Sequence, residues 1–117
     1  MTPIQVETER LTLTALPIEL LQALVHGWTE LESALHIHAA DIHVPEEFRE
    51  AMPQSFALSL DQCRAHPDEY VWYTVWPVVL TAENRVIGTI GFAGPPDDRG
   101  YVFTGYWIDE RYPIGAS

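Results

Sequence analysis

The alternation of apolar and polar positions divides the chain into a helix-rich first part and a strand-rich second part. Arg10–Ala15 (RLTLTA) alternates at period two, which is typical of a half-buried strand. Between Pro17 and Pro67 the apolar residues recur at helical spacing. From Tyr70 onward β-branched and aromatic residues dominate. One strand, then helices, then strands predicts an α+β fold.

Two short helices are predicted after the first strand. Pro17 suits the first turn of a helix, and Gly27 is placed to terminate it. Thr29 and Glu32 have the spacing of a capping box, in which each side chain bonds a backbone N–H group of the other residue. The second helix should therefore run from Thr29 to about Leu35. The first helix has one apolar face, made of Leu20, Leu21, Leu24 and Val25.

Prolines punctuate the rest of the helical part. Pro45 starts a third helical stretch, and Pro53 either kinks it or begins a fourth helix. Helical character should end before Pro67, because the residue preceding a proline avoids the αR region. Residues 36–44 show no clear period. The sequence thus predicts two to four helices.

The last part of the chain predicts an antiparallel meander of three strands. Thr81–Asn84 is a turn, and Gly94–Gly100 is a longer polar turn. Pro77 predicts a bulge or an edge position in the first of these strands. The three strands are Val71–Leu80, Arg85–Phe92 and Tyr101–Ile108.

Length and composition favour a single folded domain over residues 1–117. The residues are 47% hydrophobic and 11% aromatic, which is enough for a modest core. The apolar runs are far too short to span a bilayer, and the N-terminal MTPIQVETER has no apolar signal region. We therefore expect a cytoplasmic protein that does not enter the membrane. Cys63 is the single cysteine, and it is expected to be a small buried apolar residue.

The charge balance is strongly acidic. Six arginines and no lysine stand against 17 acidic residues, which gives a net charge of −11. Such a surface repels nucleic acid and anionic membranes and favours cationic partners. Solubility alone would also account for it.

One cluster has the composition of a metal site. His36, His38, Asp41 and His43 carry ligand groups, and two histidines at i and i+2 share a face of a strand. Nothing in the pattern fixes this stretch as a strand and no second cluster accompanies it, so we expect no metal. The tryptophans of the predicted sheet are expected to lie in the core. They are Trp72, Trp76 and Trp107.

Three segments together resemble one enzyme family. Glu7–Leu13 (ETERLTL), Val86–Phe92 (VIGTIGF) with the following Gly94–Pro96, and Gly105–Ile108 (GYWI) occur in the order and spacing of the GCN5-related N-acetyltransferases. They are most similar to the branch of ribosomal-protein N-terminal acetyltransferases. The resemblance covers the chain but only about the first half of the family's domain. It implies a GNAT-like N-terminal half that ends with the family's third and fourth strands.

The resemblance also implies a cofactor and its contacts. In the family the main chain of the fourth strand receives the acetyl and pantetheine arm of acetyl-CoA. Tyr106, Trp107 and Ile108 match that strand and are the candidate cofactor-binding residues. The implied reaction is attack of a neutral amine on the thioester carbonyl, with backbone donors polarising the carbonyl. The substrate class would be amines that are cationic in solution and attack after losing a proton.

Two departures from the family pattern bear on activity. The family follows its fourth strand with a loop of two glycines and a helix that bind the pyrophosphate. Here Arg111–Ser117 matches only through Gly115 and Ala116, and Pro113 removes an amide donor. Phe103 stands where family members commonly carry a glutamate sometimes proposed as a base. The sequence therefore leaves the catalytic residues unassigned and predicts that this polypeptide alone is inactive.

Three readings of the function remain open. The chain is an acetyltransferase-like half that serves as a binding or assembly module, an active acetyltransferase whose CoA site is completed by a partner chain, or a truncated form of an ordinary enzyme. The Tyr101–Ile108 strand contains no charge and no proline, which leaves its edge without the usual protection. A homodimer joined at this strand is expected.

Overall fold

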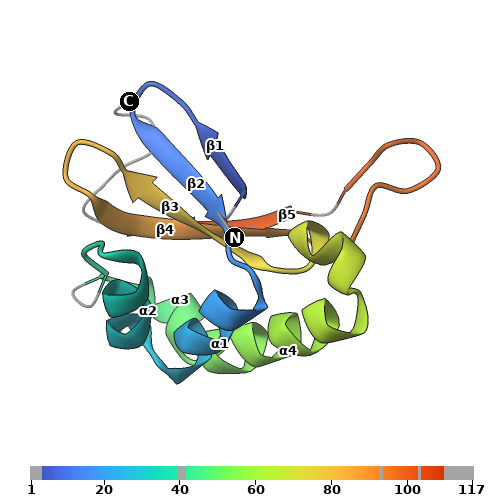
Figure 1. Cartoon of the computed structure of the whole chain (residues 1–117), viewed down its shortest axis with the longest axis horizontal. Coiled ribbons are helices and arrows are strands. Elements are labelled where there is room, and N and C mark those ends of the chain that lie inside the picture. Colours follow the sequence, from blue (N-terminus) through green and yellow to red (C-terminus); the bar gives the residue numbers. More distant parts are fainter. Residues whose placement is uncertain (1–3, 40–41, 93, 103, 110–117) are drawn as a thin grey trace.

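The computed structural model describes residues 4–39, 42–92, 94–102 and 104–109, and these form a five-stranded antiparallel sheet with helices packed on one face (Figure 1). The strands are β1 (Ile4–Glu7), β2 (Leu11–Ala15), β3 (Val75–Leu80), β4 (Arg85–Phe92) and β5 (Thr104–Ile108). The helices are α1 (Ile18–His26), α2 (Trp28–Leu35), α3 (Glu46–Arg49), α4 (Met52–Ala65) and the 3₁₀-helix η1 (Pro67–Trp72). The α+β class is confirmed.

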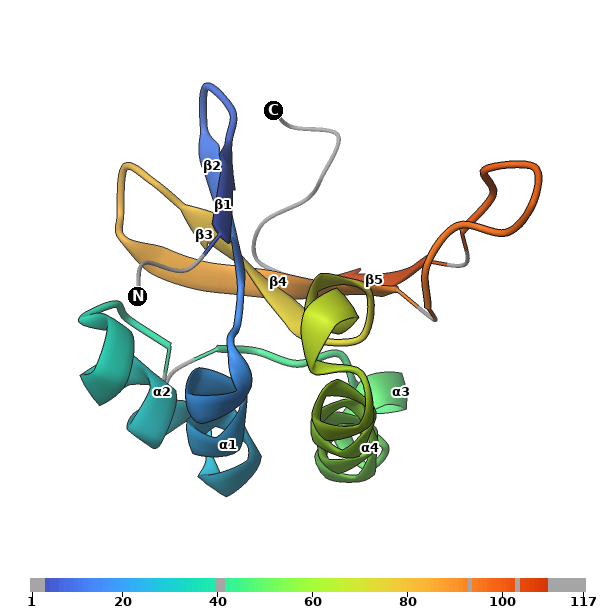
Figure 2. The same cartoon turned by 45° about the vertical axis from the view of Figure 1, so that its right-hand side comes forward.

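The strands follow one another across the sheet in chain order, β1-β2-β3-β4-β5. The predicted meander is confirmed as β3-β4-β5, and the β4 bounds and the Thr81–Asn84 turn are as expected. β1 was not predicted, and it forms a hairpin with β2 that projects from the rest of the sheet (Figure 2). Every residue of β1 is exposed, so the strand has no buried face to leave a pattern.

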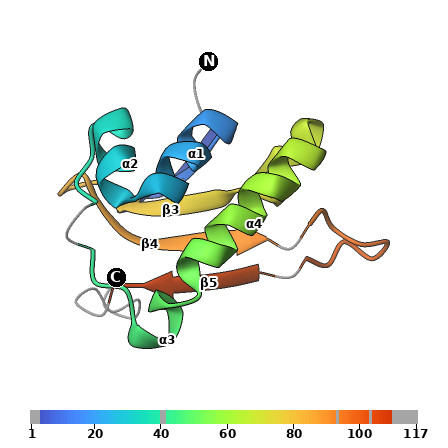
Figure 3. The same ribbon diagram turned by 90° about the horizontal axis from the view of Figure 1, so that it is seen from below.

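The main core lies between the helical layer and the sheet. In the view from the helical side, α1 and α4 lie in front of the strands and α2 lies at one end of the sheet (Figure 3). Burial of the aliphatic and aromatic side chains between the two layers makes the largest favourable contribution to their packing. The buried cluster consists of Leu16, Leu21, Leu24, Leu31, Met52, Phe56, Leu60, Cys63, Val75 and Trp107. No helix in the described part of the chain combines the length and apolar character needed to cross a membrane.

The predicted start of the second helix is wrong, although its end at Leu35 is right. α2 begins at Trp28 with Gly27 at its N-cap, so Thr29 lies inside the first turn and is exposed. The Glu32 carboxylate accepts a hydrogen bond from the N–H of Ala39 at 2.9 Å. Glu32 therefore stabilises the chain beyond the helix instead of its N-terminus, and the capping box does not form.

This arrangement predicts opposite outcomes for two alanine substitutions in α2. Glu32→Ala removes a charged acceptor from the N–H of the buried Ala39 and should destabilise the fold by about 1–2 kcal/mol. Thr29→Ala should change stability by less than about 0.5 kcal/mol, because an exposed helical position loses no partner. Urea melts of the two variants test this. A larger loss of unfolding free energy in Thr29→Ala than in Glu32→Ala would mean that the capping box does form.

The prolines act as helix starts. Pro53 is the second residue of a new helix, α4, and does not kink the preceding one. α4 ends at Ala65 as predicted, but Pro67 then opens η1, so helical character does not stop there. The predicted strand start at Val71 is consequently wrong, and β3 begins at Val75. A proline at N1 loses no intrahelical hydrogen bond, which suits this 3₁₀ turn.

Pro77 occupies neither an edge strand nor a bulge. β3 is a central strand, and Pro77 is buried within it opposite Thr89. The irregularity falls next to it, where Val78 pairs with Gly88 and Val79 pairs with Val86, so that Ile87 is the extra residue on β4. The β2–β3 pairs run from Leu11↔Leu80 to Leu13↔Val78 and stop just before Pro77, which has no N–H to contribute.

Candidate functional site at the β5 edge

β5 is the last strand of the sheet in the described part of the chain, and its register fixes which backbone groups face outward. The N–H of Asp109 donates to the C=O of Ile87 at 2.6 Å. Hydrogen-bonded and non-hydrogen-bonded pairs alternate in an antiparallel ladder. The backbone N–H and C=O groups of Trp107 and Gly105 therefore also point toward β4. The N–H and C=O groups of Thr104, Tyr106 and Ile108 therefore face away from β4.

The candidate cofactor-binding residues Tyr106, Trp107 and Ile108 are brought together on this strand but differ in their side chains. Tyr106 is 58% exposed, whereas Trp107 is 6% exposed and belongs to the core. The indole of Trp107 makes an edge contact with Trp28, with ring centroids 6.4 Å apart. Trp107 is thus a packing residue, as the sequence predicted, and Tyr106 and Ile108 supply the outward main-chain groups.

β5 is shorter at its N-terminal end than the predicted strand Tyr101–Ile108. β5 begins at Thr104, and Tyr101 and Val102 lie before it as exposed residues. Position 103 is outside the described residues, as is the whole of the predicted loop region 111–117.

A cleft of about 470 Å³ runs beside the same strand. Its walls come from α3 and α4 on one side and from the last residues of β4 with β5 on the other. The helical wall is partly polar, because Ser55 and Ser59 line it together with Phe48, Met52 and Phe56. Tyr106 and Trp107 line the opposite side. The open edge of β5 and this cleft together form the candidate site.

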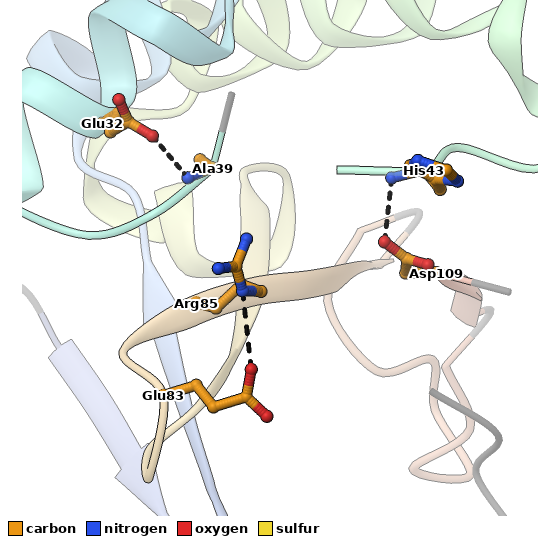
Figure 4. Close-up of polar contacts among 6 residues, drawn as sticks. All are labelled: Glu32, Ala39, His43, Glu83, Arg85 and Asp109. Atoms are coloured by element: carbon orange, nitrogen blue, oxygen red, sulfur yellow. Dashed lines mark hydrogen bonds and ion pairs between the residues drawn. The ribbon is translucent and has the colours of Figure 1, made fainter. Parts of the chain in front are cut away.

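The end of β5 is anchored by a buried carboxylate that the sequence reading missed. Asp109 is 1% exposed, and its Oδ2 accepts a hydrogen bond from the N–H of His43 at 2.8 Å (Figure 4). A buried charge is tolerated only with hydrogen-bonding partners, so the aspartate holds residues 42–44 against the sheet. The signal in the sequence that could have indicated this anchor is an acidic residue directly after a predicted buried strand.

The chain before this anchor joins the same side of β4. The N–H of His38 donates to the C=O of Asn84, and the N–H of Val86 donates to the C=O of His38. His38 therefore forms a parallel bridge with Arg85. Figure 4 shows Glu32 fixing Ala39 close to this bridge. These bonds explain why residues 36–44 showed neither a helical nor a strand period.

Gly88 in the VIG segment allows β5 to approach β4 closely. A Cβ atom built on Gly88 would overlap the carbonyl oxygen of Trp107 and lie 2.7 Å from Cδ1 of Ile108. Gly91, on the same strand, would meet nothing within 4 Å. Only the first of these two glycines is needed for the geometry of the β5 edge.

The other candidate residues have local roles. In the described part of the chain, His36, His38 and His43 are not part of any group of three potential metal ligands, and Asp41 lies outside the described residues. Asp97 bonds the polar turn, its Oδ1 accepting from the N–H groups of Arg99 and Tyr101 at 2.9 and 3.0 Å.

Cys63 is fully buried, as expected. Burial raises the pKa of its thiol, and a hydrogen bond with Thr74 lowers it by less. The thiol is therefore protonated at neutral pH and is a packing group, not a nucleophile.

Comparison of the chain with protein-family models, with curated proteins and with solved structures gives no match in any of the three.

Proposed function

We propose that this chain is the N-terminal half of a GNAT-type acetyltransferase fold and that the β5 edge is its binding site for the acetyl-pantetheine arm of acetyl-CoA. One observation carries the proposal. The strand that bears Gly105-Tyr-Trp-Ile108 ends the described sheet with outward main-chain groups at Tyr106 and Ile108, beside a cleft of about 470 Å³.

The chemistry of the arm fits these groups. Pantetheine carries amide N–H and C=O groups along an extended chain, and an edge strand pairs with such a chain as it would with another strand. The apolar and hydroxyl side chains of the cleft suit the uncharged arm better than they suit a phosphate. An amine acceptor fits the net charge of −11, which attracts cations. We also propose a cytoplasmic location, because acetyl-CoA is a cytoplasmic metabolite.

The diphosphate of the cofactor has no comparable partner in these residues. Anion sites at helix starts need free N–H groups, and Arg111–Ser117 provides a proline and no two-glycine pattern. A net charge of −11 also opposes a polyanion. We therefore assign no catalytic residue and propose an arm-binding module. In it, catalysis by these 117 residues alone is not expected, and residues outside them would have to complete an active site.

The proposal predicts an unusual order of affinities. Neutral S-acetylpantetheine should bind the polypeptide as tightly as acetyl-CoA or more tightly, both in the high-micromolar to millimolar range, because the phosphates add repulsion and no contact. Raising the salt concentration should strengthen acetyl-CoA binding and leave acetylpantetheine unchanged. Calorimetry gives the affinities, and amide chemical shifts of Tyr106 and Ile108 report the location.

Two results would contradict this proposal. Micromolar or tighter binding of acetyl-CoA would reveal a phosphate site elsewhere in the chain. Acetylpantetheine shifts confined to residues outside β5 and its cleft would remove the edge from consideration.

The same edge has a second proposed occupant, another copy of this chain. Within residues 104–108 there is no charged side chain, so two copies of a strongly acidic protein meet here without like charges facing each other. The outward residues Thr104, Tyr106 and Ile108 are symmetric about Tyr106, so an antiparallel two-fold pairing centred there uses all of them. Acetylpantetheine and the second copy are then alternative occupants of one edge.

A further inference from the structure

A second cavity lies within the helical layer, next to the β5 cleft, with which it shares Met52 and Phe56. Its volume is about 520 Å³, in the range of small-molecule sites. It is bounded by the end of α1, the start of α2, residues 42–44, α3 and the first turns of α4. The lining residues are Leu24, Val25, His26, Gly27, Trp28, Ile42, His43, Val44, Arg49, Met52, Pro53 and Phe56.

Arg49, the one charged residue in the described part of this lining, has the opposite sign to the net charge of the protein. Among the described residues no acidic side chain lines the cavity, whereas one arginine and two histidines do. These are Arg49, His26 and His43, and all three are exposed. In the described part of the chain none of the three forms an ion pair with a carboxylate.

Arg49 is held at the mouth of the cavity by the main chain. Its Nη2 donates to the C=O of Val44 at 3.2 Å, which leaves the other guanidinium N–H groups for a ligand. The Asp109 carboxylate fixes the neighbouring wall through the N–H of His43. The starts of α2 and α4 also line this cavity, and their partial positive charge is opposed by the C-terminal end of α1, which lines it as well.

The floor of the cavity is apolar. Leu24, Met52 and Phe56 are buried, and Trp28 is half-buried with its ring in edge contact with Phe56 at 5.9 Å between centroids. A ligand must therefore combine an apolar body with one polar end. A single negative charge suits that end, because a guanidinium binds it directly and the overall charge of −11 penalises each further negative charge.

We propose that this cavity binds a small free carboxylic acid with an aromatic or branched apolar body, whose carboxylate lies on Arg49 and whose body lies against Trp28 and Phe56. The proposed ligand is chemically unrelated to acetyl-CoA, and Arg49, which binds its carboxylate, lines this cavity and not the β5 cleft.

The test uses four probes and two variants of the whole polypeptide. The probes are 3-phenylpropionate, its neutral amide, N-acetylphenylalanine and phenyl phosphate, each measured by ligand-observed NMR or calorimetry. Phenylpropionate should bind with a submillimolar Kd, at least tenfold tighter than the amide and tighter than phenyl phosphate. Weaker binding of N-acetylphenylalanine than of phenylpropionate identifies a free acid as the ligand, not a peptide C-terminus. The reverse order would overturn that choice.

Arg49→Gln should weaken phenylpropionate binding at least tenfold and leave the affinity for the amide unchanged, which also shows that the variant keeps its cavity. Arg64→Gln is the matched control, because Arg64 is also exposed but lies in the last turn of α4 and does not line the cavity. Equal affinities for acid and amide would overturn the proposal. So would equal effects of the two variants, tighter binding of phenyl phosphate, or no binding at 10 mM.

Discussion

Replacing Gly88 with alanine should destabilise the protein by about 3 kcal/mol, near the upper end of the range for overpacking a tight site. The added methyl group would overlap the carbonyl oxygen of Trp107 and contact Ile108, so β5 would have to move away from β4. A backbone oxygen cannot rotate away as a flexible side chain can. Because Trp107 is part of the core, the displacement would also disturb its packing against Trp28.

Gly91→Ala is the matched control for this prediction. The two glycines lie on the same strand, but the methyl group at position 91 meets nothing within 4 Å. Alanine restricts the unfolded chain more than glycine does, so Gly91→Ala should be neutral or stabilising by up to about 1 kcal/mol. Urea unfolding followed by tryptophan fluorescence measures both. Equal losses in the two variants would mean that β5 does not approach β4 as closely as described.

The polypeptide should be a dimer in solution, with a mass twice the 13.2 kDa of one chain. Tyr106→Glu should convert it to a monomer. In the proposed two-fold pairing Tyr106 lies opposite its own copy, so the substitution places two carboxylates face to face at a cost of several kcal/mol. Tyr106 is 58% exposed within one chain, and the change should therefore leave the folded monomer intact. Light scattering on a sizing column, over a concentration series, gives the mass.

Val6→Glu is the control for the dimer. It introduces the same charge at a residue that is 50% exposed on β1, the opposite edge of the described sheet. This variant should remain a dimer. A wild-type monomer at high micromolar concentration would defeat the proposed pairing. A dimer that persists in Tyr106→Glu would place the interface elsewhere.

Elements with a strong local pattern could be predicted from the sequence. The alternation in RLTLTA, the apolar face before Gly27 and the β-branched run of Arg85–Phe92 appear in the structure as β2, α1 and β4. The Thr81–Asn84 turn links β3 to β4 and a longer polar turn links β4 to β5, so the meander order also follows from neighbouring segments. In each case the relevant interactions lie within a few residues or between adjacent strands.

The candidate site was predicted only in part. Tyr106, Trp107 and Ile108 do lie together on one strand, but the sequence could not say which of their backbone groups face outward. That depends on the register with β4, including the extra residue at Ile87. Nor could it reveal the cavity at Arg49, because its lining comes from segments that are separate in the sequence, within 24–28, 42–44 and 49–56.

The sequence by itself determined the types of most elements, their order and the acidic surface, because periodicity and composition are properties of the chain alone. Tertiary structure decided the partners of individual polar groups. Glu32 had the spacing to cap its own helix, but the N–H of Ala39 is its partner in the fold. Asp109 bonds His43, which is 66 residues away in the sequence. Such pairs depend on which surfaces are buried against each other, and local spacing does not contain that information.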